Sequence, residues 1–278
     1  MADFDKASFA RIVCALAPYL GDIVFVGGWA HRLFRLHPLA RLTPFRPLMT
    51  TDADIAAPAR IPARAGTIRE LLLAADFTEH LSGDQTPPRA EYRLSQTGGD
   101  ISVQFVTPLT GGEHRRDGSL NATTRVQGVT AEKLRYIDLL LTEPWTVNLS
   151  SAGGFPVGAL PVPVRICNPV SYLAQKILSL PKRQREKRGK DVLYVHDTLL
   201  LFGAAFEELR LIWAETVRPI VSRKAMIEIV EAPARRFSGV TDAARDAAIE
   251  ARSTGDRDVR VENLVAVCRH GLSQVFPG

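Results

Sequence analysis

Two short segments near the N-terminus constrain the fold of this chain more than any other feature. Residues 23–26 are four β-favouring apolar residues that break into Gly27-Gly28 and a helix-compatible stretch, and residues 51–55 read Thr-Asp-Ala-Asp-Ile. The first segment predicts a strand, a glycine turn and a helix, a combination in which backbone can approach a ligand as closely as a phosphate requires.

Asp52 and Asp54 lie two residues apart, so on a strand both carboxylates point to one face and their neighbours to the other. Paired carboxylates bind hard divalent cations, and Mg²⁺ leaves its remaining positions to water and substrate phosphates. Two such ions can stabilise the attacking and leaving oxygens of a phosphoryl displacement. The pattern therefore indicates metal-assisted transfer from a nucleoside triphosphate (NTP).

The arrangement resembles the polymerase-β-like nucleotidyltransferase superfamily, in which a strand and a Gly-Gly or Gly-Ser turn open a helix and the next strand reads apolar-Asp-apolar-Asp-apolar. The resemblance implies that Asp52 and Asp54 are catalytic and bind Mg²⁺ or Mn²⁺, and that Gly27, Gly28 and Thr51 bind the nucleotide. The usual serine is absent from the turn, so a hydroxyl that often helps to hold the triphosphate is missing.

The superfamily places a third carboxylate on a strand beside the two aspartates, and this chain departs from that pattern. In residues 101–106 the expected position is occupied by Gln104. A neutral amide cannot act as a general base and is a poorer Mg²⁺ ligand than a carboxylate. Either two aspartates suffice with help from elsewhere, or the enzyme is degenerate. Asp100 and Glu91 are the nearby candidates for the missing charge.

The second half of the chain resembles AbiEii-type and related nucleotidyltransferase-like toxins, in which a helix with Ala-x-Lys is followed by a basic stretch and then Arg/Lys-Asp. Ala174-Gln175-Lys176 and Lys190-Asp191 match that pattern. The resemblance implies that Lys176 is catalytic and contacts the triphosphate, and that Asp191 orients this lysine or serves the acceptor. From the residues alone, a snorkelling lysine and a first-turn acid are the alternatives.

The net charge of +5 is concentrated in one segment. Residues 1–163 carry 16 basic and 16 acidic side chains, residues 164–200 carry 8 and 3, and residues 201–278 carry 11 and 11. A run of this kind is either a solvated loop between helices or a surface that contacts RNA or triphosphate phosphates. The predicted phosphate contacts are Lys182, Arg183, Arg185, Lys187 and Arg188.

These observations predict an α/β (α+β) nucleotidyltransferase-like domain with a mixed sheet over residues 1–128 and a mostly helical domain over residues 129–278. Residues 37–50 contain three prolines and are expected to form a loop that could cover a site. No apolar run approaches a membrane span, and residues 1–6 lack a signal-peptide pattern, so we expect a cytoplasmic protein.

Two functional hypotheses follow. The first is a metal-dependent nucleotidyltransferase that moves a nucleoside monophosphate from an NTP to an acceptor; the basic segment favours RNA, with the tRNA acceptor end as the concrete expectation. The resemblance adds a toxin of a toxin–antitoxin or phage-defence system, with a cognate antitoxin as partner. The second is a catalytically degenerate protein of the same fold that binds nucleotide, RNA or a partner protein, and Gln104 keeps it open.

Overall fold

The chain forms two compact units in the computed structural model, which describes residues 2–96, 99–114, 116, 118–158 and 161–278. Residues 1–33 and 49–167 make the first unit, and residues 34–48 and 168–278 make the second. The division differs from the boundary expected after residue 128, because the three strands that follow this residue all pair into the sheet of the first unit.

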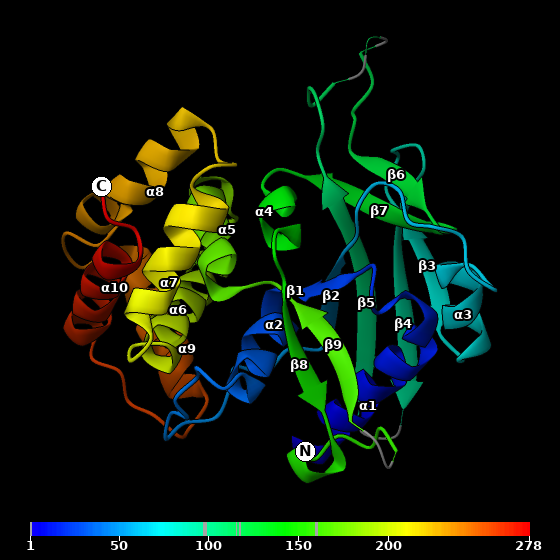
Figure 1. Cartoon of the computed structure of the whole chain (residues 1–278), viewed down its shortest axis with the longest axis horizontal. Helices are drawn as coiled ribbons and strands as arrows, with labels where there is room; N and C mark the ends of the chain where they lie inside the picture. Colours follow the sequence, from blue (N-terminus) through cyan, green and yellow to red (C-terminus); the bar gives the residue numbers. More distant parts are fainter. Residues whose placement is uncertain (1, 97–98, 115, 117, 159–160) are drawn as a thin grey trace. The chain divides into compact units, whose positions relative to one another are not determined.

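One mixed sheet organises the first unit, and its neighbouring strands run β3-β4-β5-β2-β1-β9-β8, with β7 pairing to β5 and β6 to β7 (Figure 1). The pairs β2–β5, β1–β9 and β5–β7 are parallel and the others antiparallel. The strands of the described residues are β1 (Val24–Val26), β2 (Asp52–Ala56), β3 (Thr78–Ser82), β4 (Arg89–Gln96), β5 (Gly99–Pro108), β6 (Thr123–Val126), β7 (Val129–Leu134), β8 (Trp145–Leu149) and β9 (Val162–Ile166).

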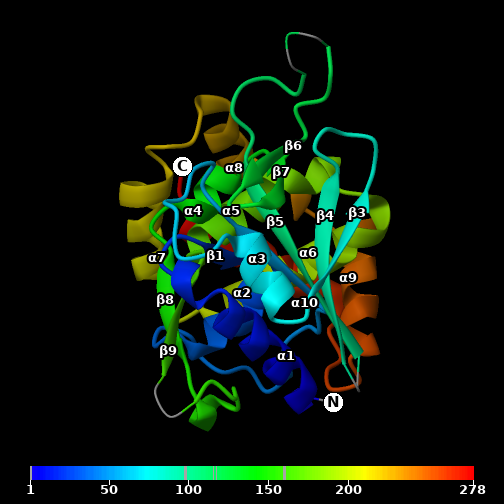
Figure 2. The same cartoon turned by 90° about the vertical axis from the view of Figure 1, so that its right-hand side faces the viewer.

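Helices α1 (Ala2–Ala15) and α3 (Ile68–Ala74) lie over one face of this sheet (Figure 2). The apolar residues of β2 and β5 that alternate with the polar ones, among them Ile55 and Phe105, are buried on this side. The three-residue spacing of Thr67 and Glu70 is that of a capping box, and the structure forms it at the start of α3. Burial of this face leaves the opposite, polar face of the central strands for the site.

Helix α2 (Gly27–Leu33) follows β1, as the glycine pattern predicts, and α4 (Ile137–Leu141) connects β7 to β8. Trp29 of α2 is fully buried and stacks on Phe9 of α1, with 4.0 Å between the ring centroids. A stacked aromatic pair in the core attaches α2 to α1. The glycine turn is thereby held at the end of β1.

The second unit is helical, as predicted for the C-terminal half of the chain. Its helices are α5 (Pro169–Ser179), α6 (Arg185–Leu201), α7 (Phe206–Ile212), α8 (Arg223–Arg236), α9 (Asp242–Ser253) and α10 (Val261–Val275), with 3₁₀ turns at Phe34–Leu36 and Leu180–Lys182 and a π-helical turn at Trp213–Val217. None of the helices in the described part of the chain is long and apolar enough to cross a membrane.

Helix α6 begins at Arg185, so most of the basic run is helical and does not form a loop between α5 and α6. Arginine, lysine and glutamate are good helix formers, which explains why the run is helical. Gly189 lies inside α6 because α9 crosses there: a Cβ at this position would lie 2.7 Å from Asp246 Cβ and 2.9 Å from the Asp246 carbonyl carbon. The close contact of the two helices requires the glycine.

Candidate active site

Strand β2 carries both aspartates to the polar face of the sheet, between β1 and β5. Asp54 lies opposite Val26 of β1 and Gln104 of β5, and Asp52 lies opposite Ser102. The Ser102 hydroxyl donates to Asp52 Oδ1 at 2.9 Å. Asp52 is exposed and Asp54 half-buried, so the predicted pair is positioned on one face and open to a ligand.

Gly27 lies directly against the second aspartate. Its φ is +62°, and a Cβ built on it would lie 2.2 Å from Asp54 Oδ2. A side chain at residue 27 would therefore meet both a left-handed backbone and the carboxylate. The glycine turn and the Asp-x-Asp strand form one local structure, in which the turn makes room for Asp54.

Gln104 occupies the position predicted for the third carboxylate. The parallel register places it next to Asp54, and on its other side the antiparallel register places Glu91 of β4 opposite it. Gln104 Nε2 donates to Glu91 Oε1 at 3.3 Å. The predicted strand register is thus confirmed, and a neutral amide separates the two carboxylates.

The carboxylate of Glu91 is held by Arg93 and Gln104. Arg93 donates to Glu91 Oε2 from Nε at 2.8 Å and from Nη2 at 2.6 Å. Burial raises the pKa of Glu91, but hydrogen bonds, chiefly from Arg93 and also from Gln104, lower it below its ordinary value. Glu91 is therefore an ionised, saturated carboxylate and not a free acid that replaces the missing one. Asp100, the other candidate, lies opposite Ser95 near the start of β5.

The Asp52–Asp54 pair fits a Mg²⁺ ion that is bound jointly by protein carboxylates and substrate phosphates. This ion needs only one or two protein carboxylates and keeps its other positions for water and phosphate oxygens. Both aspartates are on β2, face the same way and are accessible, and Gly27 packs against one of them. The described residues contain no group of three or more His, Cys, Asp or Glu that could hold a metal by itself.

Lys176 of α5 and Asp191 of α6 form a buried ion pair in the second unit. Lys176 Nζ is 2.6 Å from Asp191 Oδ1, and the two side chains are 10% and 4% exposed. The ammonium also lies 5.1 Å from the ring centroid of Tyr194 and 5.5 Å from that of Tyr172. The second carboxylate oxygen, Asp191 Oδ2, is 2.9 Å from Arg183 Nε. The lysine is thus fixed by a carboxylate and two aromatic rings.

The cations of the basic run have different surroundings. Arg183 pairs with Asp191, and Arg188 donates to the backbone carbonyls of Arg183 and Pro181. These two side chains hold the start of α6 together. Arg185 and Lys187 are exposed, and no ion pair or hydrogen bond of either side chain is found among the described residues. Arg185 also borders a shallow groove between α6 and α9, whose other side includes Asp246 and Glu250.

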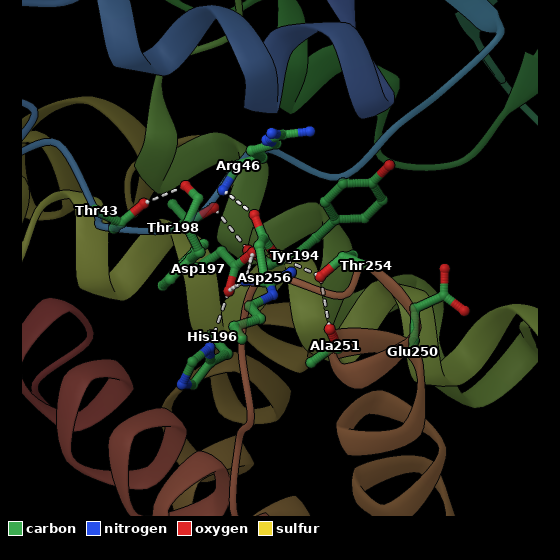
Figure 3. A network of polar contacts seen from close by, with 12 residues as sticks. Thr43, Arg46, Tyr194, His196, Asp197, Thr198, Glu250, Ala251, Thr254 and Asp256 are labelled. Atoms are coloured by element: carbon green, nitrogen blue, oxygen red, sulfur yellow. Dashed lines mark hydrogen bonds and ion pairs between the residues drawn. The ribbon is translucent and has the colours of Figure 1, made fainter. Parts of the chain in front are cut away.

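Residues 34–48, which we call the strap, belong to the second unit although their neighbours in sequence form α2 and β2. The backbone N–H of Arg46 donates to Asp256 Oδ2 at 2.6 Å (Figure 3). The guanidinium of Arg257 stacks on Phe45 at 4.3 Å and donates to both oxygens of the fully buried Asp197. The predicted loop is therefore attached to the helical unit by an exposed hydrogen bond to Asp256 and by the contact of Phe45 with Arg257, whose ion pair with Asp197 is buried.

The strap also changes the distribution of charge. Residues 23–51 contain four arginines and no Asp or Glu, a run that ends at the first aspartate of the site. Counted by unit, the second unit has 21 Lys and Arg against 14 Asp and Glu, and the first has 14 against 16. The positive charge of the second unit thus comes from the strap and from residues 168–200, whereas the first unit is slightly acidic.

One tryptophan and two histidines near the motifs are buried in the core. Trp29 and His31 are fully buried in α2, and His196 of α6 is 4% exposed, with Nδ1 2.9 Å from Asp197 Oδ1. These positions agree with leaving all three out of the predicted catalytic set. The residues that sequence reasoning passed over are Ser102 and Arg93, which contact Asp52 and Glu91 on the polar face.

A comparison with known protein families identifies the family of this chain. A family model described as nucleotidyltransferase matches residues 6–218, which include the glycine turn, both aspartates, Lys176 and Asp191. This chain belongs to the nucleotidyltransferase family. Membership assigns it to the transferase enzymes, as the sequence motifs predict.

Among solved structures, the nucleotidyltransferase is similar to MenT4, a nucleotidyltransferase toxin from Mycobacterium tuberculosis H37Rv. The two share 16% sequence identity with a TM-score of 0.38, over 100% of this chain and 86% of the other. No curated protein sequence matches the chain.

Proposed function

We propose that this nucleotidyltransferase moves a nucleoside monophosphate from an NTP to the hydroxyl of an acceptor, with Asp52 and Asp54 at its centre. The observation that carries the proposal is the placement of both aspartates on one open face, with Gly27 packed against Asp54. Asp52 and Asp54 would hold Mg²⁺ or Mn²⁺, which neutralises phosphate charge and favours in-line displacement when bound.

In the proposed reaction the acceptor oxygen forms a bond to the α-phosphorus of the NTP. The bond between this phosphorus and the bridging oxygen of the β-phosphate breaks, pyrophosphate leaves, and the hydroxyl proton passes to a carboxylate or to water. The protein's part is positioning and charge stabilisation, as in phosphoryl transfer generally. Thr51, which is exposed, and the Gly27-Gly28 turn would contact the nucleotide.

Lys176 is proposed to contact the triphosphate, with Asp191 as its positioning residue. The 2.6 Å ion pair and the two tyrosine rings restrict the lysine to one orientation, which lowers the entropy cost of placing its charge. Asp191 also binds Arg183, so one carboxylate positions two cations. The contact of Lys176 with the triphosphate itself is inferred from the motif resemblance.

RNA is the acceptor that the charge distribution favours, and the tRNA acceptor end is the specific proposal. A basic second unit with exposed Arg185 and Lys187 suits a polyanion, because phosphate contacts release counterions. The similarity to toxin nucleotidyltransferases in the motifs leads us to propose a cytoplasmic toxin of a toxin–antitoxin or phage-defence system, with a cognate antitoxin as protein partner.

A second candidate function rests on Gln104. With a neutral amide between Asp54 and Glu91, the protein would bind nucleotide, RNA or a partner without transferring a nucleotide. The two candidates agree on binding at the polar face and differ in turnover.

Transfer of label separates the two. The purified protein is incubated with each α-labelled NTP, Mg²⁺ and total tRNA, in parallel with the Asp52→Asn/Asp54→Asn double variant. The proposal predicts labelled RNA with the wild type and none with the double variant. Nucleotide binding without transfer by the wild type would favour the degenerate candidate, and equal labelling by the double variant would contradict the assigned site.

A further inference from the structure

Arg93 on the polar face combines positive charge, a position fixed by an ion pair, and exposure near the aspartates. Asp52 on β2, Ser102 on β5 and Arg93 on β4 lie side by side in the strand register. They therefore share a face, and Arg93 is two strand spacings, roughly 10 Å, from Asp52 in backbone terms. Half of the Arg93 side chain is exposed (50%).

Glu91 fixes the guanidinium in this place. Of the five N–H donors of Arg93, one on Nε and one on Nη2 donate to Glu91 Oε2, at 2.8 and 2.6 Å. The other oxygen of Glu91 accepts from Gln104 Nε2 at 3.3 Å. Gln104 therefore braces Glu91 from β5 while Glu91 holds Arg93. A carboxylate at residue 104 could not hold Glu91 in this way, because two carboxylates directly opposite each other would repel.

We propose that Arg93 binds a substrate phosphate beside the Asp52–Asp54 pair, and that Glu91 is its positioning residue. The inference rests on the proposed function and adds a phosphate contact on the first unit. Its physical basis is the geometry of the guanidinium: with two donors held by Glu91, the other three remain for a planar, bidentate contact with phosphate oxygens. An extended triphosphate, or the acceptor phosphates of a strand, spans the distance between Asp52 and Arg93.

Two sources offer this phosphate chemistry, the triphosphate of the nucleotide and the backbone of the acceptor RNA. Binding is therefore measured in two arms. In the first, a non-hydrolysable NTP analogue is titrated with Mn²⁺ by calorimetry. In the second, labelled total tRNA is titrated by fluorescence anisotropy at several salt concentrations.

A matched control lies on the opposite face of the same sheet. Arg69 of α3 donates to both oxygens of Glu79 on β3, and its side chain is 40% exposed. Arg69→Gln therefore removes a comparable ion pair from the face that does not carry the aspartates. Both variants are expected to lower the melting temperature to a similar degree, so any difference in binding reports the role of Arg93 and not its stabilising effect.

We expect Arg93→Gln to weaken binding roughly tenfold in one of the two titrations, the low end of the effect of losing a charge-assisted hydrogen bond. Arg69→Gln should leave the affinity in both titrations unchanged. A loss in the first arm assigns the triphosphate. A loss in the second, with the salt slope reduced by about one, assigns an acceptor phosphate.

Two further variants test the positioning role. Arg93→Lys keeps the charge but loses the planar fork, so it should recover part of the affinity, and Glu91→Gln should lose less affinity than Arg93→Gln because the guanidinium remains but is no longer fixed. Equal binding by Arg93→Gln and Arg69→Gln in both arms would overturn the inference and leave the proposed function intact. A wild-type protein that binds neither analogue nor RNA would overturn both.

Discussion

Replacing Gly27 by alanine tests the contact between the glycine turn and the second aspartate. At φ +62° a Cβ would lie 2.2 Å from Asp54 Oδ2 and 3.2 Å from Asp54 Cγ. The left-handed backbone costs an alanine roughly 1–2 kcal/mol. Displacing the carboxylate adds about 1–3 kcal/mol, the usual cost of overpacking. We expect Gly27→Ala to lower the free energy of unfolding of the first unit by about 2–5 kcal/mol and to weaken metal binding.

Native-state hydrogen exchange of the β1 and β2 amides in increasing urea measures this loss within the first unit. The control is Gly111→Ala, at φ +82° with no atom within 4 Å of the added Cβ, which isolates the backbone cost. Adding Asp54→Ala to Gly27→Ala removes the clashing carboxylate, so a double-mutant cycle should give a coupling energy of about 1–3 kcal/mol. A loss no larger than that of Gly111→Ala, or a coupling near zero, would refute the reasoning.

Three other predictions address separate parts of the molecule. Gln104→Glu would place three carboxylates on adjacent strands, so its melting temperature should fall in chelator and recover with Mg²⁺ more than that of the wild type; an identical Mg²⁺ response would contradict this. Neutralising Arg185 and Lys187 should reduce the salt slope of RNA binding by about one per lost phosphate contact, and an unchanged slope would make these cations a solvated surface. Hydrogen bonds from Arg69 lower the pKa of Glu79, so this pair stabilises the fold above the unfolded glutamate pKa of about 4.3 and the stabilisation is lost as pH falls through the folded-state value. Glu79→Gln should therefore flatten the acid side of the stability profile, and a parallel profile would exclude this linkage.

The local geometry of the site could be predicted from the sequence because it depends on short-range rules. The alternation of residues 51–55 determines that Asp52 and Asp54 share a face, and the position of Gln104 follows from the same period on β5. The capping box of Thr67 and the buried Trp29 are equally local. These features need one element and its immediate neighbours.

Long-range pairing could not be predicted in the same way. Alternation on β4 puts Glu91 and Arg93 on one face, but only the register with β5 shows that they meet Gln104 and Ser102. The prolines of residues 37–50 predict a loop but carry no information about its attachment to Asp256 and Arg257, about 200 residues away. A charge run is typical of a solvated loop, but residues 185–190 open α6 because arginine, lysine and glutamate favour helix.

The central claim is that the open face of β2 binds metal and nucleotide through its two aspartates. Titration of Mn²⁺ by electron paramagnetic resonance, in the presence of a non-hydrolysable NTP analogue, measures this directly on wild type, Asp54→Asn and the control Asp138→Asn, which lies on α4. The account predicts analogue-dependent Mn²⁺ binding by the wild type and by Asp138→Asn, and its loss in Asp54→Asn. Equal Mn²⁺ affinity for all three proteins would contradict it.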